Sequence, residues 1–264
     1  MATAIVCAGI PTQDLKAQDF EVAPVILNYN AEPGGIQTKT LTVRNHSNKK
    51  QSFILSLGDQ IRDSLGFKKN LPPGSTKHSC ANWVTLNPSF FELNPNESRD
   101  IEVLMQVPGN GINTRWVILY VKATEEQSAA SVDKNVATGV IVSPRIAVHI
   151  SQSPLSNQNY KASIQGFREV EASANGDRNF EVKVVNIGDK IIHPKVRLLI
   201  SNLSSASEKE MGEVSTTVMP GESRIVKLAL ATNQVKRGNY SLAALLDYGH
   251  NTDLEAVQML IEVK

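Results

Sequence analysis

The sequence predicts an all-β protein built of two tandem immunoglobulin-like β-sandwich domains. Short stretches in which apolar and polar residues alternate with a period of two recur along the whole chain of 264 residues. Gly, Pro, Asn and Asp separate these stretches, and such residues favour turns. An apolar period of 3.6 residues never persists long enough for a long helix. Many short strands spaced by turns are typical of sandwiches and barrels.

The first half of the chain is expected to supply one sandwich. Pro24 interrupts the first apolar stretch, and because Pro cannot donate to a strand ladder we expect an edge or a break there. Residues 58–82, rich in Gly and Pro, and the polar residues 124–137 are expected to be loops. The expected strands are 20–27, 38–44, 51–57, 83–86, 90–93, 99–107, 115–123 and 139–150.

The second half repeats this style after a polar segment, 151–159, that is typical of a linker. Its expected strands are 161–170, 178–185, 194–201, 211–218, 223–231, 238–247 and 256–263. The predicted organisation is therefore a leader or its remnant at 1–18, a first domain at 19–152 and a second domain at 153–264.

A weak internal repeat supports two sandwiches of similar topology. Asn45 and Asn186 each end a β-branched strand in a turn. Further along, the turns 95–99 and 220–224 share the pattern Pro-x-Glu-Ser-Arg and each precedes an alternating strand. Pro fits the second position of a tight turn, so the pattern is interpreted as structural.

Composition and motifs exclude several classes of function. Lys and Arg number 27 and Asp and Glu 26, a balance that argues against nucleic-acid binding. No apolar run approaches the ~18 residues of a membrane span. Neither the five His nor the two Cys are spaced like metal ligands, and no catalytic motif is present. Asp247 and His250 follow an apolar strand, and this position favours a hairpin turn over a hydrolase active site. The prediction is no enzyme and no cofactor.

The N-terminus favours export. Residues 2–10 form a short apolar stretch of the length of a signal-peptide core, although no basic residue precedes it. Cleavage before Asp19 would leave Cys80 as the only thiol. Its expected state is a buried, inert side chain.

Four stretches of the first half, in order, resemble the N-terminal domain of the PapD-like periplasmic pilus chaperones. They are 40–45, 83–93, 115–123 and 139–146. The resemblance covers roughly residues 20–152. It implies an immunoglobulin-like domain whose last strand lies at or near a sheet edge and captures a client protein, such as a pilus or surface subunit, by strand addition.

The resemblance also implies which residues bind the client. The family anchors a client carboxylate with two basic residues, but the matching places here are Ala23–Ile26 and Ala147. Capture is therefore expected not to require a free C-terminal carboxylate. The family's last strand also offers alternating apolar side chains. The predicted partner-binding residues are Thr138, Val140, Val142 and Arg145.

The second half resembles generic bacterial immunoglobulin-like surface modules at 181–189 and 238–249. The pair of domains is also similar to two-domain cell-surface proteins of the WxL-linked family. Two functions stay open: an exported, chaperone-like protein that binds a partner by strand addition, and a structural or adhesive cell-surface or cell-wall-binding protein without chaperone activity.

Overall fold

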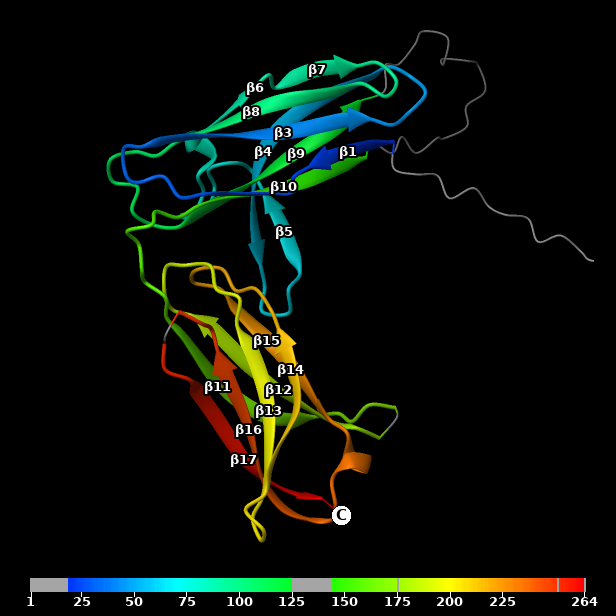
Figure 1. Cartoon of the computed structure of the whole chain (residues 1–264), viewed down its shortest axis with the longest axis vertical. Helices are drawn as coiled ribbons and strands as arrows, with labels where there is room; N and C mark the ends of the chain where they lie inside the picture. Colours follow the sequence, from blue (N-terminus) through cyan, green and yellow to red (C-terminus); the bar gives the residue numbers. More distant parts are fainter. Residues whose placement is uncertain (1–18, 125–143, 175, 251, 264) are drawn as a thin grey trace, which may run out of the picture.

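The computed structural model describes residues 19–124, 144–174, 176–250 and 252–263. Figure 1 shows two β-sandwiches arranged one after the other along the long axis of the molecule. The predicted all-β class with two tandem immunoglobulin-like sandwiches is confirmed. The exact domain limits, 19–152 and 153–264, stay a prediction.

Two sheets face each other in the first sandwich. One has the order β1 (Phe20–Ala23), β3 (Ile36–Asn45), β8 (Ser98–Gln106), β6 (Val84–Asn87). The other has the order β2 (Ile26–Tyr29), β10 (Arg145–Gln152), β9 (Arg115–Thr124), β4 (Gln51–Arg62). β7 (Phe90–Leu93) and β5 (Lys68–Leu71) then pair with the two ends of β4.

The second sandwich is simpler. Its smaller sheet has the order β11 (Ala162–Val170), β12 (Arg178–Asn186), β15 (Ser223–Leu230). Its larger sheet has the order β14 (Glu208–Ser215), β13 (Lys195–Asn202), β16 (Gly238–Asp247), β17 (Glu255–Val263).

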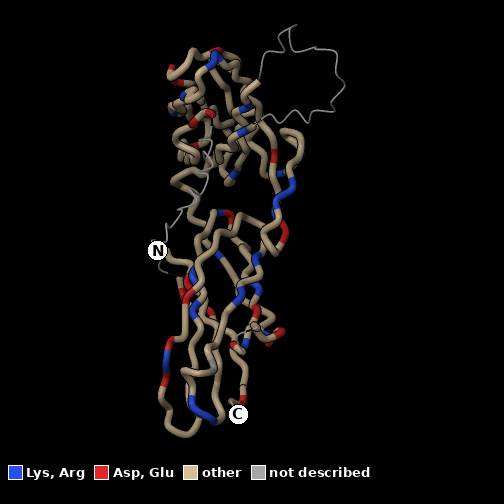
Figure 2. Tube along the Cα trace, turned by 90° about the vertical axis from the view of Figure 1, so that its right-hand side faces the viewer, with Lys and Arg blue, Asp and Glu red and all other residues tan. Residues whose placement is uncertain are grey.

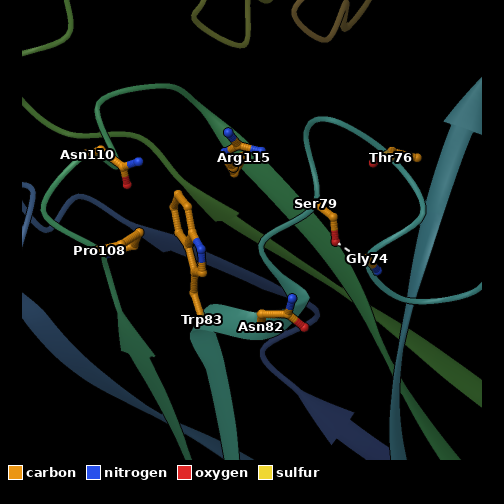
Figure 3. Close-up of a pocket in the computed structure, with 8 residues that line it drawn as sticks. All are labelled: Gly74, Thr76, Ser79, Asn82, Trp83, Pro108, Asn110 and Arg115. Atoms are coloured by element: carbon orange, nitrogen blue, oxygen red, sulfur yellow. Dashed lines mark hydrogen bonds between the residues drawn. The ribbon is translucent and has the colours of Figure 1, made fainter.

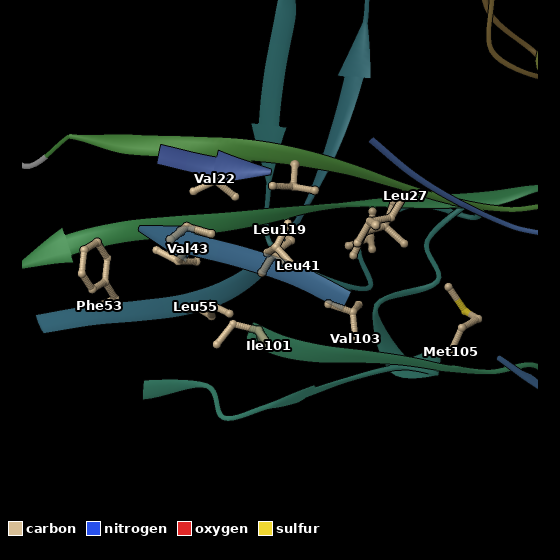
Figure 4. Packing of buried hydrophobic residues seen from close by; sticks show 14 of the residues in the cluster. Val22, Leu27, Leu41, Val43, Phe53, Leu55, Ile101, Val103, Met105 and Leu119 are labelled. Carbon is tan, nitrogen blue, oxygen red and sulfur yellow. The ribbon is translucent and has the colours of Figure 1, made fainter. Parts of the chain in front are cut away.

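Each sandwich has a hydrophobic core of its own, made by the inward residue of every apolar–polar alternation. In the first core Leu41, Val43, Ile101 and Val103 from neighbouring strands are fully buried, as Figure 4 shows. The Phe53 ring packs edge-on against Phe20 and stacks on Phe91, with centroids 5.3 and 5.4 Å apart. Lys, Arg, Asp and Glu are distributed along the chain of both sandwiches (Figure 2).

The sequence predicts a loop over 58–82, but the first part of this segment forms strands. β4 continues to Arg62 and forms a hairpin with β5, with Asp59 paired to Leu71. Gly58 does not interrupt β4. It lies under the Tyr120 ring, where an added Cβ would approach a ring carbon to 2.9 Å. The glycine is required by this close contact and not by a turn. The other expected strands of the described residues are present, although β14 begins three residues earlier than expected.

Asn45 closes the end of the first sandwich. Its buried side-chain amide donates to the carbonyls of Lys49, Leu93 and Asn94, at 2.8, 3.1 and 3.1 Å. Its backbone N–H donates to the carbonyl of Glu97 in the Pro-x-Glu-Ser-Arg turn, at 3.0 Å.

Asn186 does the same in the second sandwich. It is also buried, and its amide donates to the carbonyls of Lys190 and Val218, at 2.8 and 3.0 Å. Its backbone N–H donates to the carbonyl of Glu222, again at 3.0 Å. The weak sequence repeat therefore corresponds to the same hydrogen-bonded Asn turn at one end of each sandwich.

Replacing Asn45 with Ala should destabilise the first sandwich. Three buried or part-buried carbonyls would lose their donor, which costs about 2–4 kcal/mol in free energy of unfolding. The measurement is urea unfolding followed by tryptophan fluorescence. Asn48→Ala, on the exposed side of the same turn, is the control and should stay within about 0.5 kcal/mol of wild type. Equal unfolding midpoints for the two variants would contradict this account of the corner.

Candidate functional site

The chain changes sheets at Pro24. β1 pairs with β3 in one sheet, and directly after Pro24 the strand β2 joins the other sheet, parallel to β10. This is the strand break that the sequence predicts at this position. β2 is short, and its register covers only His149–Gln152 of β10.

The first half of β10, Arg145–Val148, therefore has one strand neighbour among the described residues, β9. The direction of its backbone groups follows from two hydrogen bonds. The carbonyl of Pro144 accepts from Ala123 of β9, whereas the N–H of His149 donates to Val25 on the opposite side. Because direction alternates along a strand, the N–H and C=O of Arg145 and Ala147 point away from β9, to the open side.

The side chains of this open half are partly apolar. Val148 is buried and Ile146 packs partly buried against the core, whereas Arg145 and Ala147 are exposed on the outer face. The Arg145 guanidinium lies over the Tyr120 ring, 4.5 Å from its centroid. We call Arg145–Val148 the open edge.

Of the four partner-binding residues predicted from the sequence, Arg145 lies on the open edge. Thr138, Val140 and Val142 lie outside the described residues. Sequence reasoning missed Ala147, whose backbone faces the open side. The alternation of Ile146, Val148 and Ile150 could have indicated it, because it fixes which residues face outward.

Another exposed edge is protected against pairing. β14 lies at the rim of its sheet and carries Glu208, Lys209, Glu210 and Glu213. Its ladder with β13 also contains a bulge, since the register skips Met211. Charges and bulges are common devices that prevent strand addition, and the open edge of β10 has fewer of them.

The β4–β5 hairpin reaches from the first sandwich to the second, as Figure 1 shows. Near its tip the carbonyl of Ser64 accepts from the N–H of Ile225 at 2.7 Å, and the carbonyl of Asp63 accepts from Arg224 Nη1 at 2.9 Å. Ile225 belongs to β15, the rim of the smaller sheet. The hairpin thus accepts a hydrogen bond from a backbone N–H on the outer side of β15 and links the two sandwiches.

Asp189 makes a second link between the sandwiches. Its Oδ2 accepts from Thr114 N and Asn113 Nδ2, both at 3.1 Å, and from Asn157 Nδ2 at 2.7 Å. Asn157 lies in the polar segment that the sequence marks as a linker. This part of the segment is held by hydrogen bonds to both sides of the junction.

A partly buried polar contact joins Arg62 of β4, His149 of β10 and Glu222 of the second sandwich. Arg62 Nη2 donates to His149 Nε2 at 3.3 Å, and Glu222 Oε1 accepts from the backbone N–H of Arg62 at 3.2 Å. Burial, followed by the positive charges of Arg62 and Lys68, lowers the pKa of His149 from its ordinary 6.5 to about 4. Burial raises the pKa of Glu222.

A cleft of about 580 Å³ opens beside this contact, between the sandwiches. Its basic groups already have protein partners. Lys190 Nζ donates to the carbonyl of Pro154 at 3.2 Å, and His193 Nδ1 lies 3.1 Å from Thr217 Oγ1. Arg62 contacts His149, as described above.

A smaller hollow of about 330 Å³ lies at the end of the first sandwich (Figure 3). Its wall contains the Trp83 indole, with the Arg115 guanidinium 5.3 Å from the ring centroid. Asn82, Asn110 and Ser79 add amide and hydroxyl groups.

Within the described residues, no group of three or more His, Cys, Asp or Glu is placed to hold a metal ion. Cys80 is fully buried, and burial raises the pKa of its thiol to about 12, as expected of an inert side chain. Asp247 Oδ1 accepts from Gly249 N at 2.9 Å, which is turn geometry. No helix of the described residues is long and apolar enough to cross a bilayer.

No protein-family model matches the chain, and no curated protein matches it. Solved structures do. The class 5 fimbriae chaperone CfaA shares 13% identity over 91% of this chain and 98% of its own, with a TM-score of 0.46. The E. coli chaperone DraB shares 15% over 91% and 98%, also with a TM-score of 0.46.

A third match is a chain of the complex between Salmonella enterica SafA pilin and the SafB chaperone, at 13% identity over 92% of this chain and 98% of that one, with a TM-score of 0.46. These proteins are of the kind that the first half of the sequence resembles. At these identities the likeness concerns the fold, and the assignment of function rests on the chain's own residues.

The lowered pKa of His149 predicts a pH dependence of stability. Because the folded protein disfavours the charged ring, His149 does not lower stability above pH 6.5 and lowers it progressively as the pH drops from 6.5 towards 4. His149→Gln should remove this part of the loss, about 1–2 kcal/mol over that range, given that the ring is partly exposed. The measurement is the free energy of unfolding of both proteins at pH 7 and 4.5. If wild type and His149→Gln lose equal free energy of unfolding between pH 7 and 4.5, His149 is not responsible for the loss.

Proposed function

We propose that the chain is an exported, non-enzymatic protein-binding protein of the bacterial envelope. It acts like a chaperone and captures a partner protein by β-strand addition at the open edge, Arg145–Val148. The apolar stretch at residues 2–10 supports export.

The observation that carries this proposal is the partial cover of β10. β2 pairs with its second half and leaves the N–H and C=O groups of Arg145 and Ala147 facing away from β9. An extended segment of a partner can pair with these groups, since main-chain hydrogen bonds supply affinity in strand addition. Its inward side chains would then meet Ile146, which is only partly buried.

Capture should not require a free C-terminal carboxylate on the partner. The described basic residues that line the cleft, Arg62, His149, Lys190 and His193, each contact a protein group. Amidation of a partner peptide should therefore change its affinity by less than about tenfold.

The hollow at Trp83 favours a second candidate function, adhesion to a glycan of the cell surface or cell wall. An aromatic ring beside amide and hydroxyl groups can contact the apolar and polar faces of a sugar. A glycan array separates the candidates. Binding that is lost in Trp83→Ala but kept in open-edge variants would support adhesion.

Replacing Ala147 with Pro tests strand addition directly. Pro removes the N–H that points to the open side and leaves the ladder to β9 intact, so the protein should fold. Envelope extract is passed over immobilised wild type and variant, and retained proteins are quantified by mass spectrometry. A partner retained by wild type should fall at least about tenfold on Ala147→Pro.

Ala147→Val is the matched control, because it changes the side chain and keeps the N–H. It should retain the partner. A folded Ala147→Pro variant that binds the same partner as well as wild type would contradict strand addition at this edge.

A further inference from the structure

Two cations stand side by side at the open edge. Arg145 of β10 is directly opposite Lys122 of β9 in the antiparallel register. The backbone groups of Arg145 point away from β9, so the two residues form a non-hydrogen-bonded pair, the kind in which side chains are closest. Both side chains are exposed on the outer face of the sheet.

No described carboxylate neutralises this pair. The ion pairs of the described residues join other groups. Arg145 instead leans over the Tyr120 ring. Like charges directly opposite each other on neighbouring strands are destabilising. Within the described residues this pair is therefore an unfavourable contact at the place where a partner strand would dock.

A strand added at the open edge would lie on the other side of Arg145 from Lys122. The side chain that it places opposite Arg145 would share the outer face with both cations. Its two sequence neighbours would point inward, because side chains alternate along a strand, and there they would lie near Ile146.

We propose that the partner segment carries an acidic residue, Asp or Glu, flanked by two apolar residues, and that the Arg145–Lys122 pair selects it. This rests on the proposed function and goes further, since it states the chemistry of the partner segment. The acidic side chain would lie opposite Arg145 and offset the repulsion between the two cations.

Selection from a displayed library of random 12-residue peptides tests the proposal, with the immobilised full chain as bait. Wild type should enrich peptides in which an acidic residue lies between two apolar residues. The doubly charge-reversed variant Arg145→Glu, Lys122→Glu should enrich Lys or Arg at that position instead. Lys183→Glu, which changes an exposed Lys on β12 of the second sandwich, is the control and should select the same peptides as wild type.

A selected peptide then provides the affinity measurement. Replacing its acidic residue with Gln or Asn should weaken binding about 3- to 10-fold to wild type and by much less to Arg145→Gln. Raising the salt concentration should reduce that difference, because salt screens exposed charges.

The outcomes separate the two proposals. One outcome is that the selection enriches alternating apolar peptides that bind Ala147→Pro more weakly but show no preference for an acidic residue. That result would overturn the charge selection and keep strand addition. Binding of peptides that is unaffected by Ala147→Pro would overturn the strand addition itself. A charge preference that persists in the charge-reversed variant would place the selection at other residues.

Discussion

The proposed activity depends on the place where the chain changes sheets. Pro24 ends β1, and β2 crosses to the opposite sheet, where it covers only the second half of β10. Because Pro has no N–H, it cannot continue a ladder. A longer β2 would pair with all of β10 and close the sheet. The short one both completes the first core, through Leu27 and Tyr29, and pairs with no residue before His149, so that among the described strands only β9 lies beside Arg145 and Ala147.

The second sandwich contacts Arg62 through Glu222, and Arg62 in turn donates to His149 of β10. The β4–β5 hairpin and Asp189 join the two sandwiches. His149 is also the residue at which β2 begins to pair with β10. His149 therefore both contacts Arg62 near the junction and directly follows the open edge in the sequence.

Much of the fold could be predicted from the sequence, because alternation fixes strands and inward faces. The break at Pro24 and the paired corners at Asn45 and Asn186 were also visible. Gly58 was expected to begin a loop, whereas it lies in β4 against the Tyr120 ring, which is distant in sequence. The Arg145–Lys122 pair could not be predicted either, because the register between β9 and β10 places those two residues opposite each other.

Residue-resolved amide hydrogen exchange of β10, with and without a bound partner, tests the central claim most directly. In the free protein the amides of Arg145 and Ala147 should exchange fast, whereas those of Ile146 and Val148, which point to β9, should be slow. Partner binding should slow Ala147 and leave Val148 unchanged. Slow exchange of Ala147 in the free protein, or partner protection confined to other strands, would contradict the account.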